Sequence, residues 1–202
     1  MDTLTQLNLF PDHIEKARVA ILPPCDIKGD IVLIDRADDV PSAIRRLRQS
    51  DVIGFDTETK PSFKRGISYG VSLLQLADRT TCYLFRLNKL GPNAELRDYL
   101  EDGSQIKIGL SVQDDFRSLS RWMPVRPQNF IELQKYVRAF GIEEMSLQKI
   151  YAIIFRQKIS KRQQLSNWEA QTLTPAQMLY AATDAWACLR IYLELQRRIH
   201  GQ

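Results

Sequence analysis

One stretch constrains the fold of this chain more than any other. The apolar run Val52-Ile-Gly-Phe leads directly into Asp56-Thr-Glu-Thr59. Such a run predicts a buried strand, and side chains alternate between the two faces of a strand. Asp56 and Glu58 therefore point to the same side, at the strand's end. Two adjacent carboxylates raise each other's pKa unless a cation lies between them. The pair indicates either an acidic strand end or one half of a divalent-metal site.

Length and composition are those of an ordinary globular protein. The chain has 202 residues, enough for one sizeable core, with 44% apolar and 26% charged residues. The net charge of +4 permits a polyanionic partner without requiring one. No apolar run approaches the ~20 residues of a membrane span, and the N-terminus lacks a secretory signal. We therefore expect no membrane partner.

The three cysteines are far apart in the sequence. Their spacing matches neither a disulfide framework nor a zinc finger. This favours a reducing, intracellular setting, which is the cytoplasm or, in a eukaryote, the nucleus.

The first half of the chain predicts an antiparallel meander. Residues 31–34 form a short β-rich run, and residues 38–49 have apolar side chains at helical spacing. Three successive strands are predicted at residues 52–57, 68–76 and 81–85, with a polar turn of hairpin length between the last two.

The second half predicts alternating helices and strands. A strand is expected at residues 106–110, and helices at residues 93–101, 114–122, 130–140 and 146–155. Ser166-Asn-Trp-Glu169 and Thr174-Pro-Ala-Gln177 both have the capping-box pattern of a helix start. The second opens the longest helix, which ends near residue 198.

This order predicts an α/β fold with a mixed sheet, an antiparallel meander plus parallel strands, flanked by helices. Residues 1–29 contain three prolines and a short predicted helix near residues 11–19. We interpret them as an N-terminal extension to one domain that spans residues 30–202.

A second pair of acids, Asp114 and Asp115, follows the predicted strand at residues 106–110. The pair opens a helix, where aspartates complement the helix dipole. Taken alone, that structural explanation is sufficient.

A third group lies on the long last helix, where Tyr180 and Asp184 share a face one turn apart. The alanines around them allow a neighbouring element to approach closely. A buried aspartate needs a cation or several hydrogen-bond donors. The alternative is a structural aspartate paired with an arginine such as Arg190.

Together the three groups supply acidic side chains and a tyrosine, without a histidine or cysteine cluster. Oxygen ligands of this kind suit Mg²⁺ or Mn²⁺. Several carboxylates around two cations are typical of two-metal phosphoryl transfer, in which one cation activates water and the other stabilises the leaving oxygen.

In their order along the chain these motifs resemble those of the DEDD 3′–5′ exonucleases, in the subclass with tyrosine in the third motif. The matching motifs are Phe55-Asp-Thr-Glu-Thr59, Gly-x5-Asp-x3-Leu from Gly109 to Leu119, and Tyr180-x3-Asp184. The segment from Leu165 to Ala185 is also similar to ribonuclease D and to the exonuclease domain of the Werner syndrome helicase. The resemblance covers about residues 30–196. It implies a ribonuclease-H-like fold and makes residues 30–202 a 3′–5′ exonuclease domain.

The resemblance also implies a role for each motif residue. Asp56, Glu58 and Asp184 are expected to bind two Mg²⁺ or Mn²⁺ ions, and Tyr180 is expected to orient the attacking water.

The acid of the middle motif is either Asp114 or Asp115. The family spacing from Gly109 to Leu119 fits Asp115 better. Asp115 also shares a helix face with Leu119, whereas Asp114 is turned by about 100°. Asp115 is therefore the expected metal ligand, and Asp114 is the alternative.

Substrate-binding residues are expected beside these motifs. By analogy with the family, Thr57 would contact the terminal nucleotide. Lys60 follows the first motif and is expected to border the groove. Lys161 and Arg162 belong to the densest basic run, at residues 156–162. That run suits phosphate binding, although a solvated loop explains it equally well. Trp168 is expected in the core.

The leading hypothesis is a metal-dependent 3′–5′ exonuclease that releases nucleoside 5′-monophosphates. Its partner would be a nucleic acid with a 3′ end. DNA and RNA both stay open, because no motif here reads the 2′-hydroxyl. The alternative is a catalytically silent nucleic-acid-binding or scaffolding module on the same fold.

Overall fold

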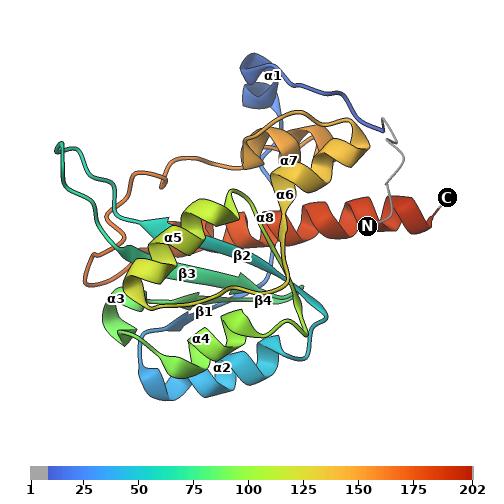
Figure 1. The fold of residues 1–202 in the computed structure, drawn as a ribbon. Coiled ribbons are helices and arrows are strands. Elements are labelled where there is room, and N and C mark those ends of the chain that lie inside the picture. The colour runs from blue at the N-terminus through green and yellow to red at the C-terminus, as the bar shows by residue number, and fades with distance from the viewer. Residues whose placement is uncertain (1–8, 202) are drawn as a thin grey trace.

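A six-stranded mixed sheet forms the centre of the structure, a computed structural model that describes residues 9–201 (Figure 1). The strand order is β1-β4-β3-β2-β5-β6. From β2 to β4 the strands are antiparallel, whereas β1, β5 and β6 pair in parallel. The strands are β1 (Asp30–Ile34), β2 (Val52–Thr59), β3 (Val71–Ala77), β4 (Thr81–Phe85), β5 (Ile106–Gly109) and β6 (Phe130–Glu132). The predicted α/β fold with a mixed sheet is confirmed.

One face of the sheet is covered by the long helix α8 (Pro175–His200). Its start is the predicted capping box, in which Thr174 and Gln177 bond each other's backbone. Three alanines of α8 pack on the sheet, and a Cβ on Gly54 of β2 would lie only 2.0 Å from the carbonyl oxygen of Ala185. The glycine therefore allows α8 to lie directly on the central strand.

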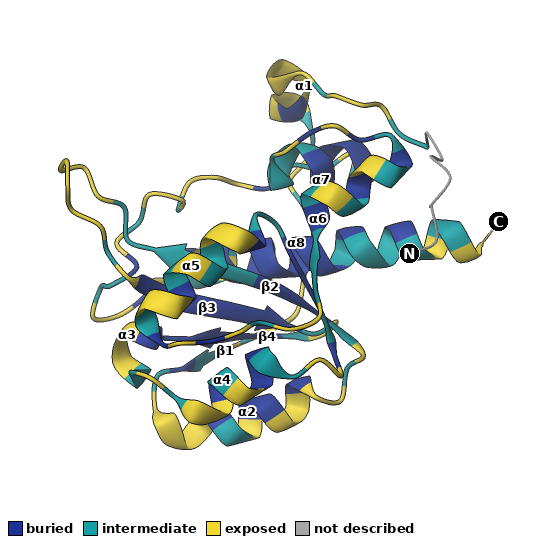
Figure 2. Ribbon diagram, viewed as in Figure 1, coloured by how far each residue is buried: buried dark blue, intermediate teal, exposed yellow. Residues whose placement is uncertain are grey.

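The other face is covered by helices that share a second apolar core with β2 and β3. They are α2 (Val40–Leu47), α3 (Leu87–Leu90), α4 (Ala94–Glu101) and α5 (Val112–Trp122), and the exposed 3-10 helix η1 (Ala37–Asp39) leads into α2. Figure 2 shows these helices buried toward the sheet and exposed outward. Phe55 of β2 points to this face and packs edge-on against Phe130, with ring centroids 4.9 Å apart. The side chains of β2 thus have two environments: those on one face pack into this core, and those on the other face point toward α8.

A third group of helices packs against the C-terminal half of α8. It consists of α6 (Leu133–Tyr136), the 3-10 helix η2 (Val137–Phe140) and α7 (Leu147–Phe155). The N-terminal segment joins this group through α1 (Lys16–Ile21), Leu9, Phe10 and Ile14. Residues 1–8 lie outside the described part of the chain, and the division at residue 29 stays a prediction.

Three local predictions need correction. Residues 130–140 do not form one helix: β6 comes first, because Phe130–Glu132 pairs in parallel with β5, and α6 and η2 follow. Ser166–Glu169 forms turns instead of a helix start, and the fully buried Trp168 fixes it to the core. The first helix begins at Lys16, later than expected.

The remaining strands and helices agree with prediction to within a few residues. The three cysteines are free thiols. Within residues 9–201, every helix is either too short or too polar to cross a membrane.

Candidate metal centre

β2 and α8 bring three predicted acids together. Asp56, Glu58 and Asp184 each offer a carboxylate oxygen, and these oxygens lie within 4.8 Å of one another. The alternation of β2 turns both of its acids toward α8, the same side as Gly54. Because α8 lies so close at Ala185, the preceding Asp184 meets the strand's acids. The strand pattern and the helix spacing therefore converge on one site.

Asp115 lies beside this cluster without joining it. It comes from the first turn of α5, and its carboxylate accepts a hydrogen bond from the hydroxyl of Thr57. Its charge still acts on the cluster, since it helps to raise the pKa of both acids of β2. Asp114, in contrast, is exposed and pairs with Arg117 at 2.7 Å. Of the two adjacent acids, only Asp115 bonds a side chain of β2 and acts on the pKa of the clustered acids.

Burial and crowding raise the pKa values of the acids. Burial, followed by the charges of the neighbouring carboxylates, raises the pKa of Asp56 well above its usual value. The same causes raise the pKa of Glu58 to about 9. Burial raises the pKa of Asp184 and of Asp115 to about 7. A divalent cation would remove this repulsion, and carboxylate oxygens are its preferred ligands. The donor set therefore fits Mg²⁺ or Mn²⁺.

Tyr180 stands one helical turn before Asp184 and lines the same cleft. Burial and the nearby charges of Asp184, Glu58 and Asp56 raise its pKa, so the phenol keeps its proton. The ring packs near the indole of Trp168, with centroids 6.0 Å apart. Trp168 is therefore a core residue, as predicted, and it also supports the tyrosine from behind.

The cluster opens into a cleft of about 370 Å³ between β2, α8 and the start of α7. Thr57 and Lys161 line it. The positive charge of Lys161 offsets part of the rise in the pKa of Asp184 that burial causes. Arg162 instead lines a neighbouring apolar pocket of about 310 Å³, which shares Tyr180 with the cleft. Lys60 forms an ion pair with Glu169, with 3.2 Å between Nζ and Oε2. Two of the four predicted substrate residues, Thr57 and Lys161, therefore line the cleft, and the other two do not.

Glu132 is a site residue that the sequence prediction missed. Its carboxylate, at the end of β6, accepts hydrogen bonds from the backbone N–H groups of Ser111 and Val112, both at 2.9 Å. Ser111 itself has a left-handed backbone (φ 60°) and does not cap α5 with its side chain. Glu132 therefore closes the start of the helix that carries Asp115. The short apolar run Phe130-Ile131 after a proline-rich loop was the available signal.

The fold and the site define a class of protein. It is an α/β protein whose central strand and longest helix together bring three carboxylates into one cluster that could hold a metal ion, with a tyrosine beside it. Comparison with known proteins narrows the class further. A family model described as 3′–5′ exonuclease matches residues 31–200. The chain belongs to this 3′–5′ exonuclease family, as the three motifs indicated.

Two curated relatives and a solved structure are similar to the chain. It is 33% identical over 184 residues to the bifunctional 3′–5′ exonuclease/ATP-dependent helicase WRN of Mus musculus, covering 86% of this chain and 13% of that protein. It is 37% identical over 152 residues to exonuclease 3′–5′ domain-containing protein 2 of Drosophila melanogaster, covering 72% and 25%. The EXO domain of Aedes aegypti Nibbler superposes with a TM-score of 0.76 at 24% identity, covering 85% and 89%. The chain thus spans about a quarter or less of these two curated relatives, and the ribonuclease-H-like fold is confirmed.

Proposed function

We propose that the chain is a 3′–5′ exonuclease that hydrolyses the terminal phosphodiester bond of DNA or RNA and releases nucleoside 5′-monophosphates. One observation carries the proposal: Asp56, Glu58 and Asp184 converge within 4.8 Å in an open cleft, in a chain of the 3′–5′ exonuclease family. An acidic cluster repels a polyanion by itself, so nucleic acid would enter only with cations bound.

The three clustered acids would hold two Mg²⁺ or Mn²⁺ ions, with Asp115 completing the set beside Thr57. Cations bound there would supply the activation of water and the stabilisation of the leaving oxygen. Asp115 accepts a hydrogen bond from Thr57, which lines the cleft, and this contact supports placing Asp115 beside the three clustered acids. Thr57 would then be free to contact the terminal nucleotide.

Two further side chains would act on the substrate directly. The phenol of Tyr180 stays protonated at neutral pH, so its oxygen can bond and orient a water molecule for attack on phosphorus. Lys161 is exposed at the rim of the cleft, where its ammonium group would bind a phosphate and hold the strand in place.

The decisive experiment is a nuclease assay on 5′-labelled strands of DNA and RNA with one sequence, run with Mg²⁺, with Mn²⁺ and with EDTA. We expect a ladder that shortens from the 3′ end and that EDTA abolishes. The double variant Asp56→Ala/Asp184→Ala should lose at least about 10²-fold in rate, and Tyr180→Phe should lose rate while it still binds Mn²⁺.

The two adjacent aspartates provide a matched control. Asp114→Asn removes an exposed carboxylate outside the cluster and should leave the rate unchanged, whereas Asp115→Asn should abolish it. Cleavage that persists in the double variant would contradict the proposed site. A wild-type chain that binds strands and never shortens them would instead support the silent binding module.

A further inference from the structure

The loop between β2 and β3, residues 60–70, projects from the body of the molecule (Figure 1). We name it the β2–β3 arm. It leaves the sheet directly after Thr59, and Glu58 of the metal cluster precedes Thr59. The arm therefore begins at the candidate site, and whatever binds along it lies next to the cleft.

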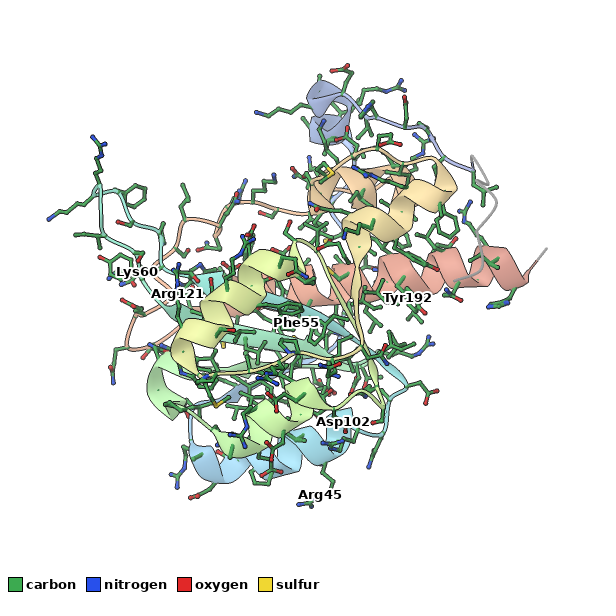
Figure 3. All side chains as sticks on the ribbon, in the orientation of Figure 1. Arg45, Phe55, Lys60, Asp102, Arg121 and Tyr192 are labelled. Atoms are coloured by element: carbon green, nitrogen blue, oxygen red, sulfur yellow. The ribbon has the colours of Figure 1, made fainter. Side chains whose placement is uncertain are left out.

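The base of the arm is held in place. Lys60 (labelled in Figure 3) bonds Glu169 at 3.2 Å, in the loop that precedes α8. The same ammonium lies 4.4 Å from the ring centroid of Tyr69, at the returning end of the arm. Lys60 thus connects the two ends of the arm with the loop that precedes α8.

The tip of the arm, in contrast, is free. Phe63 is 82% exposed, and in the described part of the chain it belongs to none of the apolar clusters. Lys64 and Arg65 beside it are exposed and have no acidic partner within residues 9–201. Gly66 completes the turn with a left-handed backbone (φ +81°). An aromatic ring and two unpaired cations are therefore presented to solvent together.

This combination is the chemistry of single-strand binding. Nucleobases stack on aromatic rings, cations neutralise the phosphates between them, and both contacts tolerate any sequence. The opposite loop adds Lys161 and Arg162, which are also exposed and without an acidic partner among the described residues. Both loops thus present exposed positive charge, and Lys161 of the second loop lines the acidic cleft.

We propose that the β2–β3 arm binds the substrate strand upstream of its 3′-terminal nucleotide, with Phe63 stacked on an unpaired base and Lys64 and Arg65 on phosphates. This inference rests on the proposed function and specifies its substrate as a strand with an unpaired 3′ region. Phe63 comes five positions after Glu58, so the Cα atoms of the two residues lie at most roughly 18 Å apart. A base only a few nucleotides from the scissile bond is the one contacted.

The test compares two substrates of different length. A single-stranded 12-mer reaches the arm, whereas the p-nitrophenyl ester of a nucleoside 5′-monophosphate fills only the terminal position. Phe63→Ala should raise KM for the 12-mer by roughly 5-fold to 100-fold and leave kcat and ester hydrolysis unchanged. Phe63→Trp should restore the wild-type KM, because tryptophan also stacks.

Ile21→Ala is the matched control, since Ile21 is an equally exposed apolar residue, 83%, on α1. Equal KM values for Phe63→Ala, Ile21→Ala and the wild type on the 12-mer would overturn the inference. If the wild type hydrolysed neither substrate, the proposed function would fail instead. Fluorescence anisotropy with the 12-mer would then still test the arm, because Phe63→Ala should weaken binding by the same factor and an unchanged affinity would refute it.

Discussion

At the residue scale, the acids of the site carry charge that folding makes unfavourable. In the unfolded chain a carboxyl group ionises near pH 4. In the folded chain the pKa of Glu58 is about 9, and the pKa values of Asp115 and Asp184 are about 7, chiefly through burial. Folding therefore favours the protonated acids, and a bound cation would reverse that preference.

The direction of these pKa shifts predicts how the stability of the fold changes with pH. Groups whose pKa is raised on folding contribute stability below the unfolded pKa and lose it as pH rises through the folded pKa. The metal-free chain should therefore become less stable between pH 5 and pH 9. Mn²⁺ binds only the ionised acids, so it should raise Tm more at pH 8.5 than at pH 6, by at least about 5 °C. Thermal unfolding in EDTA and in Mn²⁺ measures both effects.

A substitution of one carboxyl group by an amide is the control for this pH prediction. Asp184→Asn removes one raised pKa without changing the shape of the side chain, so it should flatten the pH dependence and reduce the Mn²⁺ shift. A metal-free Tm that rose from pH 5 to pH 9 would contradict the assignment of these pKa shifts.

Much of the site could be predicted from the sequence, because the positions of its side chains follow from the two-residue alternation of a strand and the 3.6-residue turn of a helix. Strand alternation places Asp56 and Glu58 together, and helix spacing places Tyr180 above Asp184. The partner of Lys60 could not be predicted in the same way. It bonds Glu169, far along the sequence, and only the tertiary fold brings the two loops together.

At the element scale, α5 depends on a carboxylate from another element. A helix start leaves N–H groups without partners, and Glu132 of β6 accepts two of those at the start of α5. It also accepts from Gln134 at 3.1 Å, so it caps α6 as well. The three-residue strand β6 thus fixes the position of the helix that presents Asp115.

Removing this cap should therefore have two effects. Glu132→Ala should lower the free energy of unfolding by about 1–2 kcal/mol, the usual cost of a lost helix cap. It should also lower nuclease activity, because Asp115 lies in the first turn of α5. Urea denaturation and the nuclease assay measure these effects. Glu143→Ala, at an exposed glutamate, is the control and should change neither; equal losses in both variants would show that Glu132 has no special role.

The strand β6 also shows where local patterns stop being informative. Residues 130–140 have apolar spacing that suits a helix, and α6 and η2 do form within them. The first three residues form a strand only because β5 offers a free edge in parallel register. Long elements such as α8 contain enough periodic positions to be predicted, whereas a three-residue strand is decided by its neighbour.

At the scale of the whole molecule, the contact between α8 and the sheet determines whether the site exists. The sequence predicted the fold class, since the order of strands and helices is visible in it. It did not predict the separation between β2 and α8, which depends on how small side chains from distant segments meet. Gly54 sets that separation, because a side chain there would collide with the backbone of α8.

Gly54→Ala should separate the two elements. The new Cβ would lie 2.0 Å from the carbonyl oxygen of Ala185, a backbone atom with little freedom to move. We expect a loss of about 1–3 kcal/mol in the free energy of unfolding and a weaker Mn²⁺-induced rise in Tm, because Asp184 moves with α8. Gly70→Ala is the control, since nothing lies within 4 Å of its added Cβ. A Gly54→Ala chain with wild-type stability and metal response would refute this role.

The arrangement of β2 and α8 also has a consequence during synthesis. The two acids of β2 leave the ribosome well before Tyr180 and Asp184, which lie on α8 more than a hundred residues later in the chain. A nascent chain therefore carries only part of the acidic cluster, and an uncovered sheet face, until α8 docks. The acidic cluster is therefore completed only when α8 docks on the sheet.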